Sequence, residues 1–248
     1  MMSGMHALWS VGCFAGAGLF SILAKLGLGI SQIAIIHCII IFMIIFAFSR
    51  YFLPYKGASN GKAIATPKGI VTLFGVLAVI SFLGEGGMMD WSGVFLTEAK
   101  GVDLSLAGVG YAVFSAAMLI GRLIGDKVVQ KLGEQRVVIF GGIVASIGYI
   151  ISIVFDNFFM MQFGFILLGF GAANIVPVVF TLLGRQKEMP INSAVTAVTS
   201  MGYLGVMFGP ALLGFIAHGI GIVTVFCILA GLFILQAIVS SYVFKVLN

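Results

Sequence analysis

Two acidic side chains lie inside an otherwise apolar stretch of this sequence, residues 81–96, which reads SFLGEGGMMDWSGVFL. Glu85 and Asp90 are five residues apart, so on a helix they point about 140° away from each other. They therefore do not form the facing pair of carboxylates that acid–base catalysis would need. A carboxyl group in apolar surroundings favours its neutral form, so Glu85 suits proton exchange or the binding of a polar solute.

The composition excludes several classes of function. The 248-residue chain is 61% hydrophobic and only 8% charged, whereas soluble domains carry about 25% charged residues. Most of its surface must therefore face lipid. The sequence has no HExxH, Walker or GxGxxG motif, so a soluble enzyme has no support. Its three cysteines form no CxxC pair or Cys/His cluster, so we predict no metal site, disulfide framework or cofactor.

Eight apolar stretches are long enough to cross a membrane as helices, which takes roughly 20 mostly apolar residues. Turn and polar signals separate them, and stretches of this length favour helices over the strands of a barrel. We therefore predict an all-α membrane protein, a polytopic bundle of eight transmembrane helices. The predicted spans are residues 5–26, 31–49, 70–97, 104–130, 136–155, 158–184, 192–217 and 222–245.

The basic residues indicate the orientation of these spans. Of the 13 Lys and Arg residues, all except Lys25 and Lys100 fall on the same side as the N-terminus or near it. Because Lys and Arg gather in cytoplasmic loops, we expect both termini to lie in the cytoplasm. The net charge of +5 then points to anionic lipid head groups as partners and not to nucleic acid.

The first and last helical hairpins resemble each other. WSVGCFAGAGLFSILAK, from Trp9, aligns with GYLGVMFGPALLGFIAH, from Gly202, and four spans lie between the two hairpins. The simplest account is a six-helix unit that occurs twice in the same orientation. We therefore predict three parts. They are residues 1–50, the last two helices of a first half; residues 51–69, a basic cytoplasmic linker; and residues 70–248, a complete second half.

A charged motif follows the fourth span and reads GRLIGDKVVQKLGEQRVV from Gly121. Arg122 and Asp126 are four residues apart, so they share a helix face and can pair. The stretch resembles the motif between the second and third helices of each half in the major facilitator superfamily, although Asp126 lies one residue further from Gly121 than usual. The resemblance implies a latch at the cytoplasmic edge of the membrane. The latch residues would be Gly121, Arg122, Asp126, Lys127, Lys131, Gly133 and Arg136.

Two further stretches are similar to the same superfamily. EGGMMDWSGVFL resembles helix seven of a bacterial subgroup related to fucose permeases, and GYLGVMFGPALLG shows a Gly–Pro pattern of the superfamily. The second resemblance implies that Gly205, Gly209 and Pro210 serve helix packing at the interface between two halves. The chain would then correspond to helices five to twelve of twelve. A truncated sequence, a degraded gene and a split protein with a four-helix partner all stay open as explanations.

The resemblance implies secondary active transport of a small solute by alternating access. Glu85 lies near the middle of its span, where a charge costs at least about 2.5 kcal/mol unless it faces a cavity or a partner. The glycines around it predict an interrupted helix. Asn174 shortly precedes Pro177, which predicts a helix break beside a polar amide. The predicted substrate- or proton-binding residues are Glu85, Asp90, Trp91, Asn174 and Tyr111.

We expect a proton-coupled carrier of the bacterial inner membrane for a neutral or weakly acidic solute such as a sugar. Two other functions fit parts of the sequence. An intramembrane enzyme would need two reactive groups at one depth, and Glu85 and Asp126 are predicted at different depths on different helices. A non-transporting sensor or assembly factor with the same fold is the alternative reading, which a flux assay would distinguish from a carrier.

Overall fold

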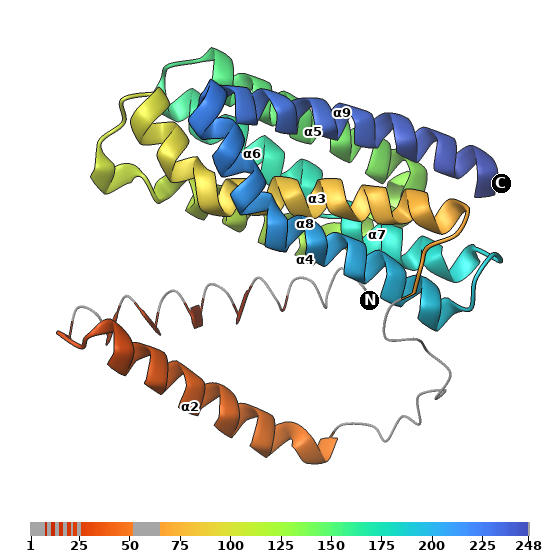
Figure 1. Ribbon diagram of the computed structural model, residues 1–248, viewed down its shortest axis with the longest axis horizontal. Coiled ribbons are helices and arrows are strands. Elements are labelled where there is room, and N and C mark those ends of the chain that lie inside the picture. Colours follow the sequence, from red (N-terminus) through yellow and green to blue (C-terminus); the bar gives the residue numbers. More distant parts are fainter. Residues whose placement is uncertain are drawn as a thin grey trace. The chain divides into compact units, whose positions relative to one another are not determined.

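A computed structural model describes residues 8, 11–12, 15–16, 19–20, 22–23, 26–51 and 65–247. These residues belong to two compact units, which divide between Gly61 and Lys62. Within the described residues every regular element is helical (Figure 1). The predicted span 5–26, and with it the repeat of the two hairpins, falls largely outside the described residues, as does most of the predicted linker.

The first unit contains α2, Ile30–Phe48, which ends in a short 3₁₀ turn at Ser49–Tyr51. The ring of His37 joins this helix to the segment before it, because Nδ1 lies 2.9 Å from the Ile33 carbonyl and Nε2 lies 3.1 Å from the Gly16 carbonyl. Two backbone contacts on one imidazole indicate a structural role for His37.

The second unit is a bundle whose successive helical spans run in opposite directions, and one of these spans, Phe158–Arg185, is broken into two helices. Its helices are α3 Ile70–Val94, α4 Val109–Leu132, α5 Glu134–Val154, α6 Phe158–Ala172, α7 Ile175–Leu182, α8 Ile191–Ile220 and α9 Ile222–Leu247. A five-residue π-helical turn, Phe95–Ala99, extends α3. The turn residues Gly133 and Gly221 have φ values of 83° and 91°, a conformation that favours glycine. The chain reverses there from α4 to α5 and from α8 to α9.

Six helical segments of the described residues are long and apolar enough to cross a membrane. They are Ile30–Tyr51, Ile70–Ala99, Glu134–Val154, Phe158–Arg185, Ile191–Ile220 and Ile222–Leu247. They correspond to six of the eight predicted spans. The predicted span 104–130 is the helix α4, which begins later because Leu104–Leu106 forms a 3₁₀ turn. It is not among the six segments, so the count of eight stays a prediction.

The core of the bundle is built on close helix packing. The helix α5 packs on α6 and α9, while α3 packs on α8 and α9, and α4 packs chiefly on α6. Glycines allow the closest approaches: a Cβ on Gly148 would lie 2.5 Å from the Gly164 carbonyl oxygen, and one on Gly164 would lie 2.6 Å from the Gly148 carbonyl oxygen. Small residues at such interfaces let helix backbones come together in lipid.

A buried aromatic cluster fills the space between α3, α5 and α9. The rings of Phe95 and Phe226 stack with centroids 4.0 Å apart, and Tyr149 meets Phe226 edge to face at 5.4 Å. The Tyr149 hydroxyl donates a hydrogen bond of 3.1 Å to the Gly84 carbonyl. A buried tyrosine hydroxyl needs such a partner, and this one fixes the middle of α3 against α5.

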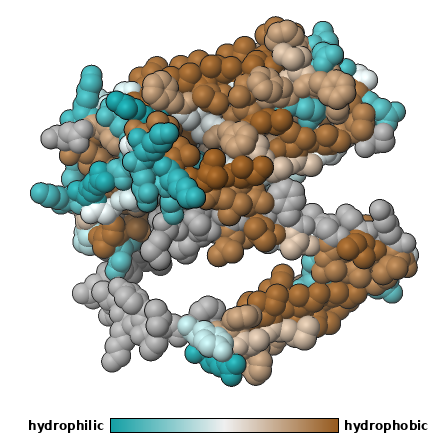
Figure 2. Space-filling view, turned by 180° about the vertical axis from the view of Figure 1, so that it is seen from behind, coloured by the Kyte–Doolittle hydropathy of each residue, from teal (hydrophilic) through white to brown (hydrophobic). Residues whose placement is uncertain are grey.

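Polar contacts tie the helices together at one end of the bundle, the Ile70 end. Arg185 forms an ion pair of 2.8 Å with Glu134, at the start of α5. The carboxylate of Glu188 accepts a 3.2 Å hydrogen bond from the Ile70 backbone N–H, which caps α3. Hydrophilic residues gather at this end, and hydrophobic residues cover the flanks of the bundle (Figure 2).

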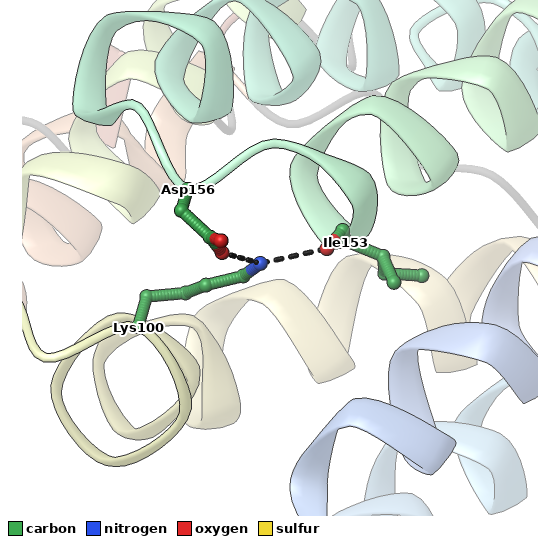
Figure 3. A network of polar contacts seen from close by, with 3 residues as sticks. All are labelled: Lys100, Ile153 and Asp156. Atoms are coloured by element: carbon green, nitrogen blue, oxygen red, sulfur yellow. Dashed lines mark hydrogen bonds and ion pairs between the residues drawn. The ribbon is translucent and has the colours of Figure 1, made fainter.

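The opposite end, the Lys100 end, is held by a network of three residues (Figure 3). The Lys100 ammonium lies 2.6 Å from the Ile153 carbonyl oxygen and 2.7 Å from Asp156 Oδ1. The Lys100 side chain is buried, whereas that of Asp156 is exposed. Because Ile153 belongs to the last turn of α5, the cation also neutralises the negative end of that helix.

We predict that Lys100→Met lowers the stability of the bundle by about 1–2 kcal/mol, because it removes a charge-assisted bond to a helix end while keeping the apolar stem. Thermal unfolding of the detergent-solubilised protein measures this change. Lys245→Met, at an exposed position of α9, is the matched control. Equal midpoints for the two variants would show that the Lys100 network adds nothing to stability.

Candidate functional site

The candidate site is an ion pair between two helices of the second unit. Nη2 of Arg122, on α4, lies 3.1 Å from Oε2 of Glu85, on α3. The Arg122 side chain is 4% exposed and that of Glu85 is 27% exposed. Glu85 lies near the middle of the span Ile70–Ala99, so the pair is held well inside the apolar part of the bundle.

The helix α3 runs through Glu85 without interruption, so the predicted break at the GEGG segment is wrong. The flanking glycines serve packing instead. A side chain on Gly84 would collide with the Phe233 ring, and one on Gly87 would come within 2.7 Å of Leu229. Both contacts are with α9, so the glycines let α9 approach one face of α3 while Glu85 projects elsewhere.

Asn174 joins the neighbourhood of this pair from a third element. The helix ends at Ala172 and restarts at Ile175, which confirms the predicted break at Asn174. The Asn174 Nδ2 donates a 2.9 Å hydrogen bond to the carbonyl of Gly121, the residue before Arg122. The Asn174 side chain is 6% exposed, and its Oδ1 has no hydrogen-bond partner within the part of the chain that the structure describes.

The other predicted site residues lie elsewhere along the same helices. Asp90 is exposed, one turn and a half beyond Glu85 on α3. The Trp91 indole packs on α8, where a Cβ on Gly214 would be 2.9 Å from its ring, and its N–H has no partner among the described residues. Tyr111 stands near the start of α4 with its ring 6.2 Å from that of Phe114.

The arrangement can hold charge and exchange a proton. Within the described ranges, no three His, Cys, Asp or Glu residues come together in a way that could bind a metal ion. The carboxyl of Glu85 is partly exposed, so a proton can reach it, and the guanidinium beside it is buried.

The sequence of the chain matches a known family of membrane proteins. The family model described as Major Facilitator Superfamily covers residues 74–247. The chain belongs to the major facilitator superfamily. Its matched region includes most of α3 and all of the helices from α4 to α9, so the candidate site lies wholly inside it.

Curated relatives of this superfamily member are bacterial membrane proteins. A Yersinia pestis protein described as an uncharacterized MFS-type transporter is 43% identical over 221 residues, which are 88% of this chain and 57% of that protein. A Sinorhizobium fredii protein described as an uncharacterized transporter is 29% identical over 88% of this chain and 59% of its own length. The Rhizobium meliloti membrane protein MosC is 30% identical over 60% of this chain and 37% of its own length. The chain therefore spans somewhat over half the length of the first two relatives.

The stretch that resembles the superfamily's latch motif divides into a buried and an exposed part. Gly121, Arg122 and Gly125 are buried, and Asp126 is half-buried. The remaining latch residues, Lys127, Lys131, Gly133 and Arg136, are exposed. The sequence interpretation placed Arg122 near the cytoplasmic edge, whereas the structure places its guanidinium against Glu85. Arg122 therefore also belongs to the candidate site, and the latch role of this stretch stays a prediction.

The Gly–Pro stretch of this superfamily member lies on α8, which continues through Pro210. Its glycines face α3: a Cβ on Gly205 would be 3.2 Å from the Val79 carbonyl oxygen, and one on Gly209 would be 2.7 Å from Leu83. The packing role predicted for these residues is therefore realised inside one bundle, and a role at an interface between two halves stays a prediction.

Proposed function

We propose that this protein moves a small solute across the bacterial inner membrane by alternating access, with transport coupled to protons through Glu85. Family membership supports the transporter class, because the superfamily model matches most of the chain. The observation that carries the coupling is the Glu85–Arg122 ion pair of 3.1 Å between α3 and α4.

The pair offers a simple coupling step. A proton that binds the Glu85 carboxylate removes its charge and weakens its attraction to Arg122, since the interaction depends on opposite charges. The guanidinium can then turn some of its five donors toward polar groups of a solute. A change in protonation at Glu85 therefore becomes a change in solute affinity.

Two further groups suit the binding of a neutral, hydroxyl-bearing solute such as a sugar. The buried Oδ1 of Asn174 is an acceptor without a partner among the described residues, and the Trp91 indole N–H is a donor without one. An unsatisfied buried polar group costs about 1–3 kcal/mol, which a bound solute could recover. We propose Asp90 and Tyr111 as residues that line the path to this site.

The charges at the two ends support an orientation. The exposed cations Lys127, Lys131 and Arg136 lie at the Ile70 end, so we propose that this end faces the cytoplasm and that both termini do. Membership of a subgroup related to fucose permeases is likewise our proposal, based on the EGGMMDWSGVFL stretch.

Vesicles that contain the protein test this function directly. With an acidic exterior, we expect vesicles to accumulate at least one labelled solute from a panel of neutral sugars and weak organic acids, and a protonophore to abolish the accumulation. A gradient of one pH unit supports about tenfold accumulation for one proton per solute. Uptake that ignores the pH gradient would contradict the coupling, and a panel without any uptake would contradict the solute class.

A further inference from the structure

We propose that Asn174 is a positioning residue, which holds Arg122 in register with Glu85 through its hydrogen bond to the Gly121 carbonyl. This inference rests on the proposed function, in which the Glu85–Arg122 pair couples protons to the solute. The break between α6 and α7 would then serve to position Arg122 through the NH₂ group of Asn174. The Oδ1 atom of the same amide keeps the role proposed above, which is to accept a hydrogen bond from the solute.

The orientation of the Asn174 amide is fixed by chemistry. Its partner is a backbone carbonyl, which can only accept a hydrogen bond, so the NH₂ group must face it. The 2.9 Å distance is that of a well-formed N–H···O bond. The bond therefore joins the break between α6 and α7 to α4, at the residue before Arg122.

The segments also touch closely at this level. A Cβ on Gly121 would lie 2.7 Å from the Cβ of Ala173, the residue before Asn174. The helix α4 packs far more extensively on α6 than on α3. The depth and rotation of α4, and with them the place of Arg122, are therefore set mainly by its contact with α6 and the break. The ion pair itself crosses the less extensive α3–α4 interface.

Few other charges can act on Glu85. On α4 the charged neighbours are Arg122 and, one turn further, Asp126; on α3 the nearest is Asp90. The helices α5 to α9 and their loops carry their charged side chains near their ends, such as Glu134, Arg136, Arg185, Lys187, Glu188 and Lys245. Two tyrosines lie further inside: Tyr149, which bonds Gly84, and Tyr203, whose ring stacks on Phe82 of α3. A displacement of Arg122 should therefore change the protonation of Glu85 more than a displacement of any other charged group.

The protonation of Glu85 can be read without knowing the solute. Dicyclohexylcarbodiimide, an apolar reagent, adds to protonated carboxyl groups in membranes, and peptide mapping by mass spectrometry locates the adduct. We would measure labelling of Glu85 against pH in the full chain in lipid nanodiscs. Asp90 in the same samples serves as an internal reference, and Glu85→Gln confirms the assignment.

Three variants give the expected pattern. Arg122→Gln should move the midpoint of Glu85 labelling up by about 1–3 pH units, because it removes a cation next to the carboxylate. Asn174→Ala should move the midpoint in the same direction by roughly half a unit or more, since Coulomb attraction falls as the guanidinium drifts away. Gln162→Met, which replaces another buried amide of α6, should leave it unchanged.

Asn174→Ser separates positioning from helix stability. Serine is a preferred residue at the position before a helix, so this variant keeps the start of α7 while losing the bond to Gly121. We expect it to shift the labelling profile as Asn174→Ala does. A parent-like profile for either Asn174 variant, with a shifted one for Arg122→Gln, would overturn the positioning role alone. An unshifted Arg122→Gln profile would instead overturn the ion pair on which the proposed function depends.

Discussion

Replacement of Glu85 by Gln is expected to abolish proton-driven accumulation of the solute. Glutamine keeps the size of the side chain and an oxygen that can accept from Arg122 Nη2, now 3.1 Å away, but it cannot bind and release a proton. The accumulation ratio in vesicles with an imposed pH gradient should fall from about tenfold to one. Exchange of labelled for unlabelled solute without a gradient should continue, because the binding groups remain.

The control for this experiment is Glu98→Gln, the same substitution at an exposed position of the π-helical turn. It should accumulate solute as the parent does. Both variants should insert into the membrane in parent-like amounts, which immunoblots of membrane fractions measure. Undiminished accumulation by Glu85→Gln would remove Glu85 from the coupling mechanism, and loss of accumulation in both variants would attribute the effect to something other than the ion pair.

The positions of most membrane helices follow from the sequence because apolar length and chain-breaking residues act locally. The predicted spans 70–97, 158–184 and 222–245 match the segments Ile70–Ala99, Phe158–Arg185 and Ile222–Leu247 closely. Asn157, predicted to lie in a turn, caps α6 by accepting from the N–H groups of Phe159 and Met160. Such signals need no knowledge of the neighbouring helices.

The interruption expected at the GEGG segment shows where local reasoning fails. Glycine weakens an isolated helix, so a run of glycines around an acid predicts a break. In the bundle, Gly84 and Gly87 make room for Phe233 and Leu229, and packing with α9 outweighs the weak helix propensity. Whether glycine breaks the helix or allows close packing depends here on residues of α9, which lie far along the sequence.

The partner of Glu85 follows from a count only when the observed helix bounds are used. With the π-helical turn counted as part of α3, Glu85 and Arg122 both lie about 13–14 residues from the Lys100 end, which places them at one depth at 1.5 Å per residue. The predicted spans 70–97 and 104–130 put that end too early on α4, so they do not bring the two residues to one depth. The resemblance to the latch motif drew attention to Asp126 instead, four residues along the same helix. Pairing within one helix is visible in sequence spacing, whereas pairing between helices also requires their rotation, which packing determines.

The packing of α5 on α6 provides the second large effect, because Gly171→Ala should destabilise the bundle severely. A Cβ at this position would lie 2.5 Å from the Ala145 backbone nitrogen and 2.6 Å from the Gly141 carbonyl oxygen. Both atoms belong to the backbone of α5, so neither can turn aside as a flexible side chain would. Overpacking typically costs about 1–3 kcal/mol, and we expect the upper part of this range for a collision between two helix backbones.

Gly231→Ala is the matched control, since nothing in the structure lies within 4 Å of a Cβ added to this residue of α9. Alanine favours helix by about 1 kcal/mol over glycine, so Gly231→Ala should be neutral or stabilising, and the gap in unfolding midpoint between the two variants should be wide. Equal midpoints would mean that α5 and α6 are further apart than the structure places them.

Gly171 lies one turn before the break at Asn174, so a methyl group that pushes α6 from α5 should also disturb the hydrogen bond that positions Arg122. The fraction of Gly171→Ala that still folds should therefore label at Glu85 up to a higher pH than the parent, which would connect the packing of the bundle to the charge state of its site.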